Sequence, residues 1–154
     1  MELQTTLGMP MKSVDLMISA RWILPIAPKN IILENHSVIV NQGRIIEVLP
    51  TDLAEDEYEA ASHRVLNNHI VMPGLINAHT HTPMNLFRGM ADDLELMDWL
   101  NNYIWPAEKE VINAESVAIG CRLAIAEMLR GGTTCFNDHY FFGDVIANTA
   151  IEEG

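Results

Sequence analysis

The sequence predicts an α/β protein, namely an incomplete (β/α)8 barrel of the TIM type, represented by its first strand-helix units and preceded by a small β-sandwich-like domain. Three observations lead to this prediction. Residues 14–49 alternate apolar and polar side chains between turn residues, as short antiparallel strands do. A short apolar strand at 75–78, opened by Pro73-Gly74, runs into two histidines. The order strand, loop, helix, strand and helix then follows, and it is typical of parallel strands joined by right-handed crossovers.

These patterns divide the chain into three segments. Residues 1–13 lack periodicity and are expected to be a flexible N-terminal arm. Residues 14–70 are expected to form the small antiparallel β domain, and residues 71–154 the start of the barrel. A complete barrel needs about 250 residues, so we expect this chain to be a truncated, N-terminal part of a longer protein.

The β domain is expected to contain several short strands with one clear hairpin. Asn41-Gln42-Gly43-Arg44 is a turn sequence between two β-branched runs, which indicates a hairpin. Residues 52–61 are expected to be a polar turn or a short helix. The expected strands are residues 14–24, 31–33, 36–41, 45–49 and 63–71.

The barrel segment is expected to alternate helices with strands. Acidic residues open a short helix at 92–100, which Ile104-Trp105-Pro106 is expected to end. Asn113 is a candidate N-cap for a helix that Gly131-Gly132 stops. Thr133 to Asn137 is then the second parallel strand, and a second helix starts at Gly143.

The composition narrows the function classes. The 154 residues carry a formal net charge of -12 and no cluster of Lys and Arg, which argues against nucleic acid as a partner. Neither a signal peptide nor a membrane span is evident, so no membrane association is expected. Cys121 and Cys135 show no disulfide or zinc pattern and are expected to be small core residues, which favours a reducing, cytoplasmic location.

The two histidines at the end of the apolar strand are a candidate metal site. Because side chains alternate along a strand, His79 and His81 project to the same side. Two neutral imidazoles on a rigid strand end suit half of a zinc or iron site. His36, His63 and His69 have no partner at ligand spacing and are expected to be structural.

The segment from Pro73 to Glu108 resembles the amidohydrolase superfamily. The Pro-Gly-x-x-Asn-x-His-x-His pattern carries this resemblance. The following loop, HTPMNLFRGMADDLELMDWL, is similar to that of the 5-methylthioadenosine/S-adenosylhomocysteine deaminases.

The resemblance implies a metal-dependent hydrolase that deaminates an adenosine-type nucleoside to the inosine analogue and ammonia. It implies His79 and His81 as ligands of one Zn²⁺ per subunit, with Fe²⁺ as the alternative metal. Glu108 matches the position whose carboxylate binds the ribose hydroxyls. The other ligands and the proton-shuttling glutamate of the family lie further along its chain, so the catalytic residues are unknown here and this segment alone is expected to be inactive.

Two alternatives stay open. The protein could be a related hydrolase acting on another amino- or chloro-substituted heterocycle, such as a nucleobase or a triazine, or the chain could be a non-catalytic fragment. The expected partner is a small nucleoside, with a homo-oligomer left open. His139 is expected to bond a neighbouring loop rather than line the pocket, and Trp99, Trp105 and Phe87 could form an apolar wall for a thioether tail.

Overall fold

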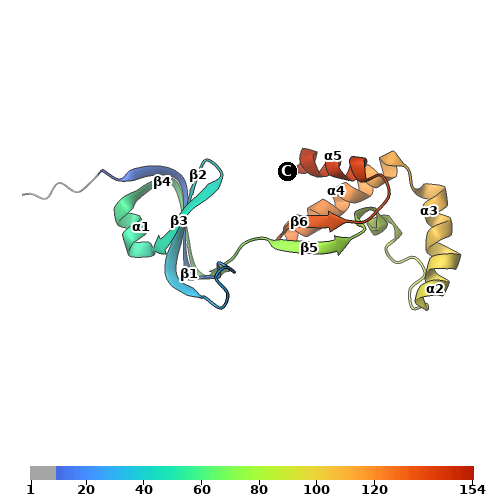
Figure 1. Ribbon diagram of the computed structural model, residues 1–154, viewed down its shortest axis with the longest axis horizontal. Coiled ribbons are helices and arrows are strands. Elements are labelled where there is room, and N and C mark those ends of the chain that lie inside the picture. Colours follow the sequence, from blue (N-terminus) through green and yellow to red (C-terminus); the bar gives the residue numbers. More distant parts are fainter. Residues whose placement is uncertain (1–9) are drawn as a thin grey trace, which may run out of the picture. The chain divides into compact units, whose positions relative to one another are not determined.

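The chain divides after Pro73 into two units, in a computed structural model that describes residues 10–154. The first unit is a four-stranded sheet with one helix, in the spatial order β3-β2-β1-β4 (Figure 1). Its elements are β1 (Lys12–Ile23), β2 (Leu33–Asn41), β3 (Arg44–Pro50), α1 (Thr51–Glu57) and β4 (Tyr58–Val71). Of the predicted N-terminal arm, residues 1–9 lie outside the described residues, whereas Lys12 and Ser13 already pair with β4.

The sheet of the first unit is mixed, so the prediction of a purely antiparallel domain is wrong. β1 pairs antiparallel with β2, and β2 with β3, but β1 pairs parallel with β4. The helix α1 explains the difference, because a helical connection can return the chain to the end from which a parallel strand starts. The described residues of this unit form one sheet, without the second sheet that a sandwich requires.

Local turn chemistry explains the hairpin between β2 and β3. Gln42 and Gly43 both have positive φ, at 51° and 71°, as the two central residues of a type I′ turn require. The predicted structural histidines of this unit include His63, whose Nε2 lies 2.7 Å from the Ser19 hydroxyl, and His36, whose Nδ1 lies 2.8 Å from the Glu34 carbonyl oxygen. Both contacts agree with a structural role.

The second unit contains two parallel strands and the helices that connect and cover them (Figure 1). Its strands are β5 (Leu75–Thr80) and β6 (Thr133–Asp138). Its helices are the 3-10 helix η1 (Thr82–Phe87), α2 (Leu96–Trp99), the π-helix η2 (Leu100–Ile104), α3 (Trp105–Val111), α4 (Ala114–Arg130) and α5 (Gly143–Glu153). This order matches the predicted strand, loop, helix, strand and helix.

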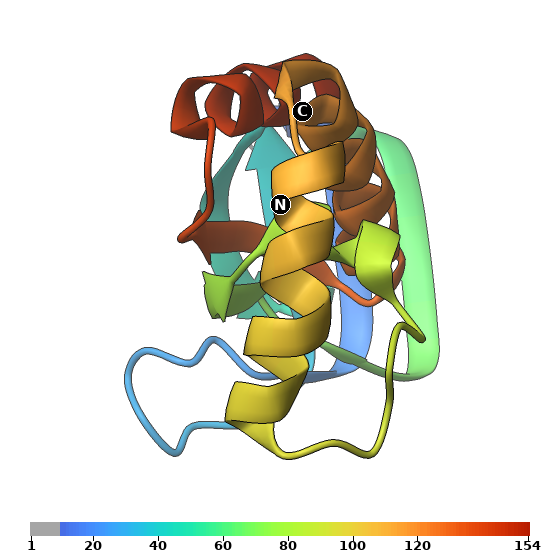
Figure 2. The same cartoon turned by 90° about the vertical axis from the view of Figure 1, so that its right-hand side faces the viewer.

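The helical segment between β5 and α4 is longer than predicted. It begins at Leu96, where the Glu95 side chain accepts from two backbone N–H groups, and not at Asp92. It also does not end at Pro106, because α2, η2 and α3 follow one another without a break to Val111 (Figure 2, yellow to orange). Pro106 is the second residue of α3, which directly follows the π-helix η2, an irregularity of the helical hydrogen bonding at the point where the proline lacks an N–H. Glu108 is therefore carried by a helix.

The helix α4 has the ends that the sequence predicts. Asn113 and Ser116 form a capping box, with Asn113 Oδ1 accepting from the Ser116 N–H at 3.1 Å and Ser116 Oγ accepting from the Asn113 N–H at 2.9 Å. The helix ends at Gly131, and Gly132 has a positive φ of 84°. Among the described residues, no helix combines the length and the apolar character that a membrane span requires.

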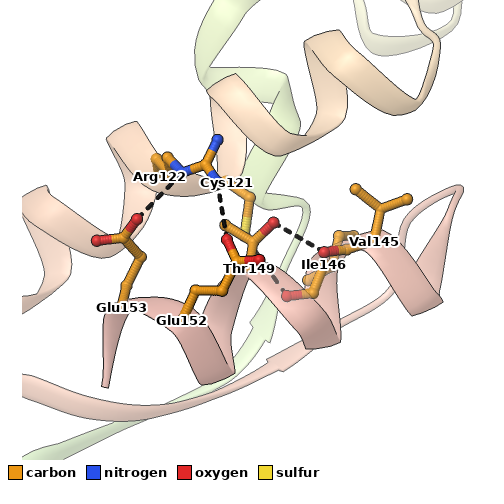
Figure 3. A network of polar contacts seen from close by, with 7 residues as sticks. All are labelled: Cys121, Arg122, Val145, Ile146, Thr149, Glu152 and Glu153. Atoms are coloured by element: carbon orange, nitrogen blue, oxygen red, sulfur yellow. Dashed lines mark hydrogen bonds and ion pairs between the residues drawn. The ribbon is translucent and has the colours of Figure 1, made fainter.

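The helices α4 and α5 pack against each other around a small core. Val117, Cys121 and Ile125 of α4 are buried with Ile146 of α5. At the edge of this contact, the Arg122 guanidinium donates to both Glu152 and Glu153, at 2.9 and 3.0 Å (Figure 3). These ion pairs hold α5 against α4.

The strands β5 and β6 are confirmed, but the expectation that Cys135 is a core residue is wrong, and the apolar residues of β5 are exposed as well. Ile76 is 71% exposed, Leu75 is 50% exposed, and Cys135 of β6 is exposed rather than part of a core. Leu75 and Ile76 are adjacent and point to opposite faces, so this two-stranded sheet leaves apolar side chains accessible on both faces. The apolar side chains of β5 are therefore not buried by the residues that the structure describes.

Candidate functional site

Three histidines meet at one edge of the two-stranded sheet. His79 lies in β5, His81 follows β5 directly, and His139 follows β6 directly. Because β5 and β6 are parallel, their carboxyl ends lie at the same edge. The His139 N–H donates to the Thr80 carbonyl oxygen at 3.0 Å, which joins the two strand ends. The predicted candidates thus lie where barrel enzymes carry their active sites.

The rings of His79 and His81 face each other through their Nε2 atoms. These atoms lie 3.4 Å apart, and the ring planes are nearly perpendicular, at 89°. A strong hydrogen bond would be shorter, at about 3 Å. Two nitrogens bound to one zinc at about 2.0–2.1 Å in tetrahedral geometry lie about 3.4 Å apart. The separation therefore fits two ligands of one metal ion better than a hydrogen bond between imidazoles.

A backbone contact sets the tautomer of His81. Its Nδ1 lies 2.8 Å from the carbonyl oxygen of His139. A carbonyl can only accept, so Nδ1 carries the hydrogen and the Nε2 of the neutral ring keeps its lone pair for a metal. The start of η1 is held as well, because the Thr82 N–H donates to Asp138 Oδ2 at 2.8 Å. The position of His81 thus depends on Asp138, which ends β6, and on His139, which follows it.

His79 and His81 are not joined by a third metal ligand in the part of the chain that the structure describes. Among residues 10–154, no group of three or more His, Cys, Asp or Glu side chains is arranged to hold a metal ion. Catalytic zinc sites commonly use three protein ligands and one open position. His79 and His81 therefore fit as part of such a site, which would need at least one further protein ligand.

Glu108 lies in the first turn of α3. Its carboxylate accepts a hydrogen bond from Tyr140, which lies just beyond the end of β6. The Tyr140 hydroxyl donates to Glu108 Oε1 at 2.6 Å. Burial raises the pKa of Tyr140 above its ordinary value, and the neighbouring Glu108 carboxylate raises it further. The Tyr140 ring also lies beside the ring of His81, with centroids 6.0 Å apart. Tyr140 therefore links the predicted substrate residue to the histidine pair.

His81, Glu108 and Tyr140 line one cavity of about 550 Å³. Its lining consists mostly of apolar and aromatic side chains around a few polar groups, as small-molecule sites do. The lining residues are His81, Met84, Leu96, Trp99, Leu100, Ile104, Trp105, Glu108, His139, Tyr140 and Phe141.

The cavity agrees with some of the sequence-based expectations and corrects others. Trp99 and Trp105 line it as proposed, whereas Phe87 is buried elsewhere and is absent from its wall. His139 was expected to bond a loop rather than line the pocket, and it does both: its carbonyl accepts from His81 and the residue lines the cavity. Sequence reasoning missed Tyr140. The available signal was its position just beyond the carboxyl end of a barrel strand.

Comparisons with known proteins identify the family of this chain. The sequence model of the amidohydrolase family matches residues 70–154. The 5-methylthioadenosine/S-adenosylhomocysteine deaminase of Saccharophagus degradans is 48% identical over 140 residues, which is 91% of this chain and 31% of that protein. The 5′-deoxyadenosine deaminase of Methanosarcina barkeri is 41% identical over 141 residues, 91% of this chain and 31% of that protein.

A solved structure is similar over nearly the whole chain. The crystal structure of an adenosine deaminase from Xanthomonas campestris with bound zinc matches with a TM-score of 0.90 and 51% identity. The match covers 93% of this chain and 33% of that one. The chain therefore spans about a third of the length of the proteins it matches.

Proposed function

The chain belongs to the amidohydrolase family, and from this premise we propose that the complete protein removes the amino group of an adenosine-type nucleoside by hydrolysis. The products are the inosine analogue and ammonia, and the proposed substrates are 5′-methylthioadenosine and S-adenosylhomocysteine. The similar proteins named as deaminases of methylthioadenosine, S-adenosylhomocysteine, 5′-deoxyadenosine and adenosine support this substrate class. These nucleosides share the adenine base and the ribose diol, and they differ at the 5′ position.

The observation that carries the proposal is the pair of facing Nε2 atoms on His79 and His81, 3.4 Å apart at a strand end. These two residues would hold a divalent metal, zinc by preference and Fe²⁺ as the alternative. When bound, such a metal lowers the pKa of water and supplies hydroxide near neutral pH. The His139 carbonyl keeps His81 in the tautomer that can bind the metal.

Glu108 supplies the proposed contact to the sugar. Its carboxylate faces the same cavity as His81, and a carboxylate can accept hydrogen bonds from two vicinal hydroxyls. Trp99 and Trp105 line that cavity and offer apolar surface for the base or for a thioether tail. The nucleoside would be oriented by its diol at one end while the amino-bearing carbon lies near the histidine pair.

Metal analysis of the intact protein tests the metal part of the proposal. We expect stoichiometric zinc or iron and ammonia release from methylthioadenosine, and we expect His79→Ala with His81→Ala to lose both. His69→Ala is the control, because this exposed histidine lies in the first unit, and it should keep metal and activity. A double variant that retains full metal content and activity would refute the proposal.

Glu108 separates the nucleoside deaminase from the alternative heterocycle hydrolases. Glu108→Ala should raise the KM for a nucleoside by about ten- to a hundredfold, the effect of losing hydrogen bonds to a charged group. The KM for free adenine should change little, because adenine has no diol. Glu110→Ala, on an exposed neighbouring position, is the control. Equal losses for nucleoside and free base would remove the ribose role and favour a substrate without a sugar.

A further inference from the structure

The contact between Tyr140 and Glu108 has no part in the function proposed above. The two residues are 32 positions apart, one on α3 and one just after β6, and they meet in the wall of the cavity. The distance from the Tyr140 hydroxyl to Glu108 Oε1 is 2.6 Å, which is in the range of charge-assisted O–H···O⁻ bonds. A tyrosine hydroxyl stays protonated at neutral pH, so it is a constant donor to this carboxylate.

The Tyr140 ring has two aromatic neighbours and packs against the core between α4 and α5. It lies beside the His81 ring, with centroids 6.0 Å apart, and beside the Phe141 ring, with centroids 5.1 Å apart. Glu108, in contrast, has a long side chain with several rotatable bonds, and among the described residues its only hydrogen-bond partner is Tyr140. An ordered ring therefore fixes the direction of a flexible side chain.

We propose that Tyr140 is the positioning residue that orients the Glu108 carboxylate and thereby sets the selectivity for a ribose diol. With Oε1 held by Tyr140, the remaining lone pairs of the Glu108 carboxylate, which has no other hydrogen-bond partner among the described residues, are available to accept from the 2′- and 3′-hydroxyls of a nucleoside. Without this bond, the carboxylate would sample several orientations and would lose part of its binding to the diol. This inference rests on the proposed function, since it concerns how the same substrate is selected.

A purely structural role for Tyr140 makes a different prediction. If Tyr140 only packed the cavity wall, the loss of its hydroxyl would affect every substrate equally or not at all. A positioning role affects only substrates that carry the diol, and only while Glu108 is present. The choice of substrate therefore separates the two roles, and Tyr140→Phe is the suitable variant because it keeps the ring.

The experiment compares adenosine with 2′,3′-dideoxyadenosine in the intact protein. We expect Tyr140→Phe to raise the KM for adenosine about tenfold, the effect of one hydrogen bond, with kcat nearly unchanged. The KM for the dideoxy nucleoside should stay the same, and Tyr140→Phe should have no further effect when added to Glu108→Ala. Tyr103→Phe is the matched control, because Tyr103 is 43% exposed and does not line the cavity.

The outcomes separate this inference from the proposed function. Equal changes for both nucleosides, or an unchanged KM for adenosine in Tyr140→Phe, would overturn the positioning role even if Glu108→Ala confirms the diol contact. A wild-type protein that deaminates neither adenosine nor 5′-methylthioadenosine would overturn the proposed function, and the positioning role with it.

Discussion

Gly120 lies where the helix α4 crosses the 3-10 helix that follows His81, and replacing it with alanine should destabilise the protein. A Cβ at this position would lie 2.8 Å from Pro83 Cα and 3.0 Å from the Pro83 carbonyl oxygen. Both atoms belong to the backbone of η1, so no side chain can rotate away to make room. Alanine therefore requires α4 and η1 to move apart.

The expected size of this effect combines two opposing contributions. Forcing an extra carbon into a packed contact costs about 1–3 kcal/mol. Alanine in place of glycine inside a helix stabilises by about 0.5–1 kcal/mol. The net destabilisation of Gly120→Ala should therefore be about 1 kcal/mol, within a range of about 0–2.5 kcal/mol. Because η1 begins directly after His81, the same displacement should also weaken the metal binding proposed for His79 and His81.

Urea denaturation of the intact protein, followed by circular dichroism, measures this effect. Gly143→Ala is the matched control, because Gly143 is also helical and a Cβ there would meet no atom within 4 Å. We expect a lower midpoint for Gly120→Ala and an equal or higher midpoint for Gly143→Ala. If both variants gained stability alike, the close packing of α4 on η1 would be refuted.

Three further experiments, two with a substituted residue and one with chemical labelling, test other parts of the structure. Asn113→Ala removes the N-cap of α4 and should cost about 1 kcal/mol in urea denaturation, so an unchanged midpoint would contradict the capping box. Burial raises the pKa of the Cys121 thiol, so iodoacetamide should label Cys121 only after unfolding, whereas the exposed Cys135 should be labelled in the native protein; rapid native labelling located at Cys121 by peptide mass spectrometry would argue against its burial. The Arg88 guanidinium lowers the pKa of Glu127 through two hydrogen bonds, so this pair stabilises the fold above the ordinary glutamate pKa of 4.5 and loses that effect as the pH falls through the lowered pKa. Arg88→Met should therefore reduce thermal stability slightly at neutral pH but not in strong acid, and equal losses in both would exclude the ion pair as the cause.

Much of the secondary structure could be predicted because its determinants lie close together in the sequence. The turn at Gln42-Gly43, the N-cap at Asn113 and the stop at Gly131 each depend on a few neighbouring residues, and the structure confirms all three. The helix through Pro106 was missed, because a proline can either end a helix or occupy its first turn. Which of these occurs depends on the preceding backbone, here the π-helix η2, and not on the proline itself.

The burial of the strands could not be predicted from this chain, since it depends on what packs against them. Ile76 and Cys135 carry the apolar character of core residues, yet both are exposed where only two strands are present. The strand directions in the sheet of the first unit could not be predicted from the sequence either. The parallel pairing of β4 with β1 is a property of the connection through α1, while the alternating pattern of each strand is the same in either direction.

The sequence by itself determined the alternation that turns His79 and His81 to one side, because neighbouring residues on a strand have a fixed geometric relation. Only the tertiary structure decided that His139 orients His81 and that Tyr140 reaches Glu108. These contacts join residues 58 and 32 positions apart, and they form because two parallel strands end at the same edge and a helix passes beside it. Sequence periodicity describes relations along one element, whereas a site is made by the packing of several.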